Sequence, residues 1–301
     1  MPAAFLHKMS LNTRLVWALL LVMTVADAAG MAVMGVEPYA PRFLVLLAAV
    51  TGMLGLSAFY TFLRRDARIA ALAHTGAVTL VFTTAAAVMS YLAVMWRHPL
   101  IDDALSRFDL SLGLDWKAAY DFVRGHFALH LALALAYFSL IVQMLLLLCL
   151  LNFLKMQQRC WELMWLFMAT SIGCLVVSAF LPAAGAFAFY QTEANDPYVL
   201  AFNDLRDGTL KIWGQVEMQG VIQFPSLHAA LGVVFAYAAR GVRVLFAVFL
   251  VLNILLILGT PSAGGHHFAD VLAGLALAAV AIAAVRAVFK RATPESFAVK
   301  P

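Results

Sequence analysis

Eight long apolar segments constrain this chain more than any other feature of its sequence. They lie at roughly 13–36, 43–63, 69–96, 127–153, 161–181, 226–240, 243–260 and 266–289, the sixth and seventh being short for a full span. A helix needs about 20 apolar residues to cross a bilayer, and backbone polar groups in lipid must be satisfied internally. Because 64% of the residues are hydrophobic and only 12% are charged, we predict an all-α, polytopic membrane bundle of about eight spanning helices.

The first apolar segment has two interpretations. Lys8 and Arg14 precede it, and the tripeptide Ala26-Asp27-Ala28 resembles a signal-peptidase site. The apolar run continues to Val36, however, so we favour an uncleaved first helix. An aspartate inside a spanning helix avoids lipid, and we therefore expect Asp27 to face protein.

Basic residues divide the loops between two sides of the membrane. One side would hold Lys8, Arg14, Arg64, Arg65, Arg68, Lys155, Arg159, Arg240, Arg243, Arg286, Lys290, Arg291 and Lys300. The other would hold Arg42, Arg97, Arg107, Lys117, Arg124, Arg206 and Lys211. Because Lys and Arg concentrate in cytoplasmic loops, both termini are predicted to be cytoplasmic. The segments 97–126, 182–225 and 260–266 then share the outer side, which brings His228 and His266 to the same membrane face.

Two of the outer segments have features of their own. Segment 100–125 places large apolar side chains, among them Leu105, Phe108, Leu112, Trp116 and Phe122, between five aspartates. We expect one or two helices that lie in the membrane interface, with the aromatic rings at headgroup depth. Segment 182–225 is the longest loop, and loops of this length between packed helices are usually functional or disordered. It leads directly into the first histidine motif, which favours a functional loop.

The residues at the start of two apolar segments are suited to phosphate chemistry. Ser226 is well placed as an N-cap, so free N–H groups of the following helix would form an anion site that His228 can also reach. His266 and Asp270 have i, i+4 spacing, so the carboxylate can hold one ring N–H and leave the other nitrogen free to attack. With His228 from a neighbouring helix, they would form a nucleophile, an orienting acid and a proton donor.

Both motifs resemble those of a known family. Pro225-Ser226-Leu227-His228 and the run from His266 to Asp270 are similar to the Pro-Ser-x-His and His-x-x-x-Asp motifs of the type 2 phosphatidic-acid phosphatase superfamily. The phrases "FPSLHA" and "HHFADVLAG" resemble the branch of inositol phosphorylceramide synthases and related bacterial membrane proteins. The resemblance covers roughly residues 180–289 and implies a six-helix phosphatase-type core toward the C-terminus. We therefore expect one membrane domain over 1–301, with N-terminal spans and outer interfacial helices in 1–125 and a catalytic core in 126–291.

The resemblance implies phosphoryl transfer without a metal or another cofactor. His266 would attack phosphorus to form a phosphohistidine, with Asp270 orienting the ring. His228 would protonate the departing hydroxyl and then act as the base for water or another acceptor. Ser226 and helix N–H groups would hold the phosphate oxygens. His267, beside the expected nucleophile, is interpreted as a packing or supporting residue.

The chain departs from the family pattern in its cations. The family's first motif, a Lys followed by Arg-Pro, is absent, and Gly259-Thr260 stands where the third motif usually has Ser-Arg. Phosphoryl transfer needs positive charge near the phosphate, and we expect Arg206 and Lys211 to supply it. Arg206 is favoured, because a guanidinium binds phosphate through two hydrogen bonds; Arg97 and Arg124 are weaker candidates.

The expected function is hydrolysis of a lipid phosphate monoester or pyrophosphate at the outer membrane face. The alternative is transfer of a phospho-headgroup between lipids, as in inositol phosphorylceramide synthases. Short loops and Ala-rich spans favour a bacterial inner membrane with the site facing the periplasm; the expected partners are lipid and bilayer, not nucleic acid. A haem protein with His228 and His266 as axial ligands leaves Asp270 and Ser226 without a purpose. A transporter or scaffold without chemistry is disfavoured by the complete set of motif residues.

Overall fold

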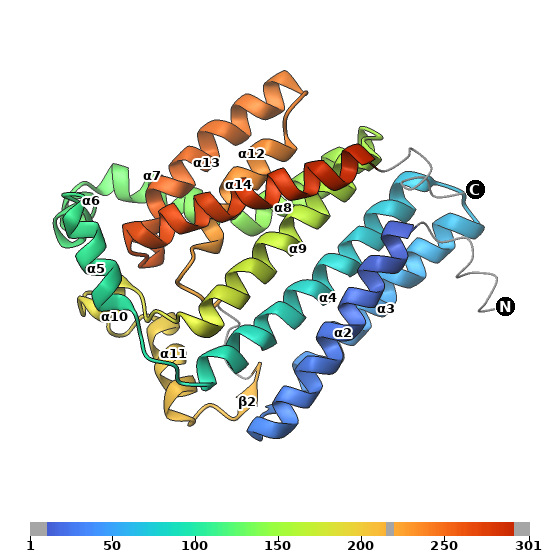
Figure 1. Ribbon diagram of the computed structural model, residues 1–301. Helices are drawn as coiled ribbons and strands as arrows, with labels where there is room; N and C mark the ends of the chain where they lie inside the picture. The colour runs from blue at the N-terminus through green and yellow to red at the C-terminus, as the bar shows by residue number, and fades with distance from the viewer. Residues whose placement is uncertain (1–10, 215–219, 292–301) are drawn as a thin grey trace.

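The computed structural model describes residues 11–214 and 220–291, and this part of the chain is built almost entirely of helices (Figure 1). The helices are α2 (Leu11–Met34), α3 (Ala40–Phe62), α4 (Ala67–Met95), α5 (Asp102–Ser111), α6 (Trp116–Gly125), α7 (Phe127–Phe138), α8 (Leu140–Phe153), α9 (Gln157–Phe180), α10 (Ala186–Phe189), α11 (Pro197–Asp207), α12 (Leu227–Ala238), α13 (Arg243–Gly264) and α14 (Phe268–Arg291). Two-residue strands, β1 (Glu37–Pro38) and β2 (Ile212–Trp213), pair in parallel. The predicted all-α polytopic bundle is confirmed.

The expected number of spans needs correction. Among the described residues, six helices are long and apolar enough to cross a membrane, namely α2, α3, α4, α9, α13 and α14. Helices α7 and α8 make a seventh span if they count as one, and they are bent by 50° at the break between them. The segment expected at 226–240 forms α12, which has only 12 residues. At 1.5 Å per residue α12 is about 18 Å long, well short of the bilayer core of about 30 Å.

Helix α12 lies inside the bundle, where it packs against α8, α9, α13 and α14. Most of its residues are buried, including Leu231, Val234 and Phe235. A helix that contacts other helices on most of its surface does not need the length of a lipid-exposed span, because protein rather than lipid surrounds it. The short α12 therefore begins and ends within the bundle and can present both of its ends to polar surroundings.

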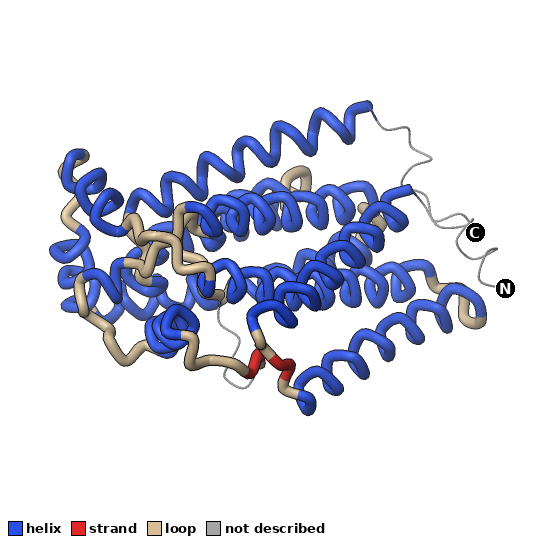
Figure 2. Tube along the Cα trace, turned by 60° about the horizontal axis from the view of Figure 1, so that its bottom comes forward, coloured by secondary structure: helices blue, strands red, loops and turns tan. Residues whose placement is uncertain are grey.

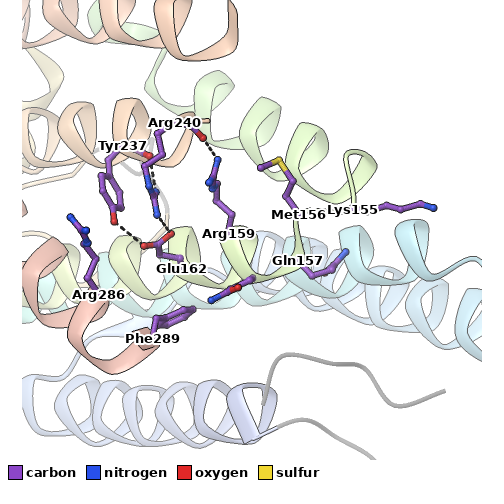
Figure 3. A pocket seen from close by; sticks show the side chains of 10 residues that line it. Lys155, Met156, Gln157, Arg159, Glu162, Tyr237, Arg240, Arg286 and Phe289 are labelled. Carbon is purple, nitrogen blue, oxygen red and sulfur yellow. Dashed lines mark hydrogen bonds and ion pairs between the residues drawn. The ribbon is translucent and has the colours of Figure 1, made fainter. Parts of the chain in front are cut away.

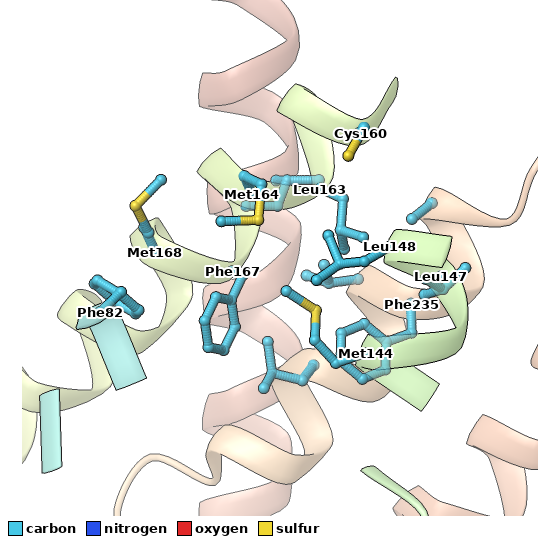
Figure 4. Close-up of a cluster of buried hydrophobic side chains, with 14 of the residues drawn as sticks. Phe82, Met144, Leu147, Leu148, Cys160, Leu163, Met164, Phe167, Met168 and Phe235 are labelled. Carbon is cyan, nitrogen blue, oxygen red and sulfur yellow. The ribbon is translucent and has the colours of Figure 1, made fainter. Parts of the chain in front are cut away.

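An apolar cluster joins α12 to α4, α8 and α9 (Figure 4). Phe82 of α4 meets Phe167 of α9 edge to face, with ring centroids 5.2 Å apart. The side chains drawn around them include Met144, Leu147, Leu148, Leu163, Met164, Met168 and Phe235. Because this cluster is close-packed and apolar, it fixes the position of α12 relative to the longer helices.

The N-terminal helices lie at the edge of the bundle. Helix α3 packs on α4 and has no buried residue, so it is the most peripheral of the long helices (Figures 1 and 2). Asp27 of α2 is only 6% exposed, which confirms that it faces protein rather than lipid. The strands link the α2–α3 connection to the loop that precedes α12, with Glu37 opposite Ile212 and Pro38 opposite Trp213.

Candidate active site

The first motif forms the start of α12. The Ser226 side chain caps this helix, its Oγ accepting a hydrogen bond from the backbone N–H of Ala229 at 3.3 Å. This confirms the predicted N-cap. His228 follows in the first turn, where its half-buried ring stacks on Tyr137 of α7, with centroids 4.1 Å apart and planes 16° apart. Tyr137 thus fixes the plane of the imidazole that the sequence assigns to proton transfer.

The second motif lies across the connection between α13 and α14. His266 Nδ1 lies 3.3 Å from Asp270 Oδ2, the carboxylate also accepting the backbone N–H of His267 at 2.9 Å. Helix α14 begins at Phe268, so His266 precedes the helix, although the predicted helical segment began at residue 266. The pairing forms because Gly265 has φ +65°, a left-handed conformation that ends α13 and turns the chain back.

The two motifs meet at the starts of α12 and α14. Ser226 Oγ is 3.4 Å from His266 Nε2, and the Ser226 backbone N–H donates to the Asp270 carbonyl at 3.0 Å. Gly274 makes this approach possible, since a Cβ at that position would lie 2.3 Å from the Ser226 carbonyl oxygen. The His228 imidazole is close enough to His266 for their charges to interact. The structure therefore brings Ser226, His228, His266 and Asp270 together.

Burial determines the protonation of His266. Its side chain is only about 3% exposed, and burial lowers its pKa from 6.5 to about 3, against the opposing effect of the Gln223 backbone. A neutral imidazole carries one hydrogen, and the contact with Asp270 places it on Nδ1. Nε2 then carries a lone pair directed toward Ser226. This is the protonation state that a nitrogen nucleophile requires.

Two further aspartates support this site and were not predicted from the sequence. Asp109 of α5 accepts the backbone N–H groups of Phe268 and Ala269 at 2.9 and 2.8 Å, and so caps α14. Burial raises the pKa of Asp109, while these two N–H groups oppose the shift. Asp102, at i−7 on the same helix, accepts the N–H groups of Ala184 and Gly185. That i, i+7 spacing was the one signal that they act together.

His267 fills the space between these aspartates. Its ring is fully buried, with Nε2 3.4 Å from Asp102 Oδ1 and Nδ1 3.7 Å from Asp109 Oδ2. The rings of Phe189 and Tyr190 pack against it, at centroid distances of 5.6 and 6.0 Å. His267 therefore links α5 electrostatically to the start of α14, in keeping with the supporting position expected for it.

The prediction that segment 100–125 lies in the interface is only partly right. Phe108, Leu112 and Phe122 are exposed, but Leu105 and Trp116 are buried. The Trp116 Nε1–H donates to the His266 carbonyl at 2.9 Å. Its ring also stacks between Tyr120 and Tyr190, each 5.0 Å away. Helices α5 and α6 are therefore part of the site, because their polar side chains satisfy backbone groups at the start of α14.

The expected phosphate-binding cations make other contacts in this structure. Arg206 donates to the His98 carbonyl at 3.0 Å, and Lys211 Nζ lies 3.4 Å from the Met34 carbonyl. Arg124 forms an ion pair with Glu193 at 2.7 Å. These three contacts join the cations to residues outside both motifs. The role of Arg206 and Lys211 as phosphate ligands stays a prediction.

Comparison with protein families identifies the chain's relatives at the level of a superfamily. The model of the PAP2 superfamily matches residues 103–284, more than half of the 301 residues, and the match spans both motifs as well as α6 and most of α5. Neither the curated proteins nor the solved structures searched contain a match. Within residues 11–214 and 220–291, no group of three or more His, Cys, Asp and Glu side chains is arranged to hold a metal ion.

Proposed function

The chain belongs to the PAP2 superfamily, and from this premise we propose that it hydrolyses a lipid phosphate monoester or pyrophosphate through a phosphohistidine on His266. Membership supports a phosphatase or phosphotransferase type of activity, and the apolar helices support a multi-pass membrane protein. The observation that carries the finer proposal is the line of contacts from Ser226 Oγ to His266 Nε2 and from His266 Nδ1 to Asp270.

In the first step, the lone pair of His266 Nε2 attacks phosphorus. A P–N bond forms while the P–O bond to the lipid oxygen breaks, and His228 in its protonated form donates a proton to that oxygen. Burial lowers the pKa of His228 from 6.5 to about 3 in this structure, so this step requires the negative charge of the bound phosphate to raise that pKa and keep the ring protonated. The positive charge that develops on the His266 ring is stabilised by the Asp270 carboxylate. The first product is the lipid alcohol. For a lipid pyrophosphate, where the attack is on the terminal phosphorus, the first product is the lipid monophosphate.

In the second step, water attacks the phosphohistidine. His228, now neutral, takes a proton from the water, the new P–O bond forms, and the P–N bond breaks to return its electron pair to Nε2. Inorganic phosphate leaves, and both histidines regain their starting protonation states. The nearness of His228 to His266 and its stacking on Tyr137 support its use in both steps.

Binding of the phosphoryl group needs donors and positive charge. The N-terminus of α12 offers backbone N–H groups, and the Ser226 hydroxyl would turn from His266 Nε2 to a phosphoryl oxygen. Asp102, Asp109 and Asp270 are all buried nearby, so the phosphate would otherwise be repelled. We propose Arg206 and Lys211 as the compensating cations, which would exchange their present carbonyl contacts for phosphate oxygens.

The orientation in the membrane follows from the basic loops. Most Lys and Arg residues stand in sequence segments that alternate with those carrying the motifs, and the positive-inside rule favours the cytoplasm for the side that they share. We therefore propose that the site faces the periplasm of a bacterial inner membrane and that both termini are cytoplasmic. A headgroup entering from the outer leaflet would reach the starts of α12 and α14 without crossing the bilayer.

The test uses detergent-purified protein, EDTA and a panel containing phosphatidate and a prenyl pyrophosphate. We expect phosphate release by the wild type and by the control variant His126→Ala, whose ring is exposed, and loss of release in His266→Ala. Equal turnover by wild type and His266→Ala would reject His266 as the nucleophile.

Trapping the intermediate separates this mechanism from its nearest competitor. In the competing mechanism the nucleophile is the Ser226 hydroxyl, with His266 as its base and Asp270 as the acid that orients His266. The same contacts would serve that arrangement. A trapped phosphoryl group that is labile to acid and stable to alkali indicates phosphohistidine, whereas an acid-stable adduct indicates Ser226. A phosphodiester that forms only when an acceptor alcohol is added would replace hydrolysis with transfer.

A further inference from the structure

A second polar site lies at the other end of α12 and α14. A cavity of about 690 Å³ opens between the start of α9, the end of α12 and the last turns of α14 (Figure 3). Its lining includes Arg159, Glu162, Tyr237, Arg240, Arg286 and Phe289. Helix α12 separates it from the catalytic motifs, because Ser226 precedes the first residue of that helix and Arg240 follows its last. The cavity is therefore distinct from the candidate active site.

The charges around this cavity are strongly unequal. Among the described residues that line it, Lys155, Arg159, Arg240 and Arg286 are basic and only Glu162 is acidic. Glu162 accepts hydrogen bonds from Arg240 Nη2 at 2.5 Å and from the Tyr237 hydroxyl at 3.0 Å. Arg240 also lies over the Tyr237 ring, 3.6 Å from its centroid. One cation is thus neutralised by Glu162, and the cavity keeps an excess of positive charge.

Two guanidinium groups that are not paired with Glu162 in this structure line the cavity, those of Arg159 and Arg286. Arg159 donates to the carbonyl of Arg240, which positions it beside Gly241. Arg286 extends from α14 toward Tyr237 (Figure 3), close enough for its charge to act on the Tyr237 hydroxyl. Lys155 extends away from Glu162 in the same view, at the margin of the cavity.

The start of α9 adds backbone donors to the same cavity. Met156 is the N-cap residue of this 24-residue helix, its own side chain makes no capping hydrogen bond, and the first turn contains no acid. Met156, Gln157 and Gln158 line the cavity. An uncapped helix start directs free N–H groups and the positive end of the helix dipole outward, and such an end beside guanidinium groups is suited to an anion.

We propose that this cavity binds a phosphate group, supplied either by the headgroup of an anionic phospholipid or by a soluble phosphoester. Arg159, Arg286 and the N–H groups of α9 hold the phosphate oxygens, while Glu162 keeps Arg240 and Tyr237 in place. The volume is larger than a phosphate alone needs, and the apolar side chains of Met156 and Phe289 provide a wall for the rest of the ligand. Binding here does not depend on the proposed catalytic activity.

The test compares Arg286→Gln with Arg243→Gln in purified full-length protein. Arg243, an exposed residue at the start of α13, belongs to the same basic side but does not line the cavity. The unfolding midpoint of each protein is measured against inorganic phosphate, dioctanoyl phosphatidylglycerol and dioctanoyl phosphatidylcholine, because a ligand that binds the folded state raises it. Arg159→Lys serves as a second variant, which keeps the charge but loses the planar donor pair.

We expect Arg286→Gln to weaken apparent binding at least about tenfold, the loss typical of one charge-assisted hydrogen bond, and Arg243→Gln to match the wild type. If Arg286→Gln reduces the rise in midpoint caused by phosphatidylglycerol alone, the phosphate group comes from a lipid headgroup. If it also reduces the rise caused by inorganic phosphate, the ligand is a soluble phosphoester. If each of the three ligands raises the unfolding midpoint of Arg286→Gln as much as that of Arg243→Gln, the proposal is overturned. His266→Ala is measured in parallel. We expect this variant to bind the ligand at the cavity as the wild type does, whether or not His266 is the nucleophile.

Discussion

The Trp116 indole nitrogen donates a 2.9 Å hydrogen bond to the backbone carbonyl of His266, although 150 positions separate the two residues. Trp116 is the first residue of α6, a helix outside the spanning segments, and its side chain is 1% exposed. This bond fixes the backbone of the proposed nucleophile just before α14 begins. Helix α6 therefore takes part in positioning the proposed catalytic residues.

Replacing Trp116 tests that role directly. Trp116→Phe keeps an aromatic ring but leaves the buried carbonyl of His266 without its donor, which costs about 1–3 kcal/mol. We expect a lower unfolding midpoint and a turnover number reduced about tenfold, with a smaller change in KM. Trp96→Phe is the control, because Trp96 is 55% exposed. Turnover by Trp116→Phe equal to that of the control would contradict a positioning role.

The cap of α14 predicts a difference between two aspartates of one helix. Asp109→Ala removes the acceptor for the N–H groups of Phe268 and Ala269, and loss of an N-cap typically costs about 1–2 kcal/mol. Asp103→Ala changes an exposed residue of the same helix and should leave stability within about 0.5 kcal/mol. Thermal unfolding of both variants, followed by turnover measurements, checks this; a larger effect at Asp103 would be inconsistent with the capping geometry.

The contact between α12 and α14 predicts a strong effect of a single methyl group. Gly274→Ala places a Cβ 2.3 Å from the Ser226 carbonyl oxygen, so α12 and α14 have to separate and the motifs move apart. We expect turnover to fall by at least about tenfold, since displacements of about 1 Å or less at a reacting centre have effects of this order or larger. Gly52→Ala in α3 meets nothing within 4 Å and is the matched control; normal activity of Gly274→Ala would refute this close approach.

The buried imidazole of His266 predicts how stability depends on pH. Burial lowers its pKa from the ordinary value of 6.5 to about 3 in the folded protein. The unfolded chain therefore binds a proton at a higher pH than the folded chain does. The contribution of neutral His266 to the free energy of unfolding is fully present above about pH 6.5 and is lost progressively as the pH falls toward 3. His266→Gln should show a shallower loss of stability as the pH falls below 6.5, measured as the unfolding midpoint. Parallel curves for the two proteins would exclude this protonation scheme.

Much of the fold is local in origin, which is why its elements were predictable. Each apolar segment contains enough neighbouring hydrophobic residues to be helical, and all eight are helical in the structure, 127–153 as the two helices α7 and α8. The Ser226 cap likewise depends on residues three positions apart. The prediction that segment 226–240 is a spanning helix was wrong, because the sequence of α12 does not reveal that other helices surround it. Burial of Asp27 was predictable, since a charge in an apolar helix has a strong preference for protein over lipid.

The amino-acid sequence is enough to predict that the chain forms membrane helices and that two motifs suited to phosphoryl transfer stand where apolar segments start. Three features become visible only once the chain is folded: Asp109 caps α14, Trp116 donates to the His266 carbonyl, and Arg206 and Lys211 contact carbonyls outside the motifs. Helix formation and capping depend on residues a few positions apart, which a sequence records. Hydrogen bonds between residues more than 100 positions apart depend on how the helices pack, and that packing is a property of the whole chain.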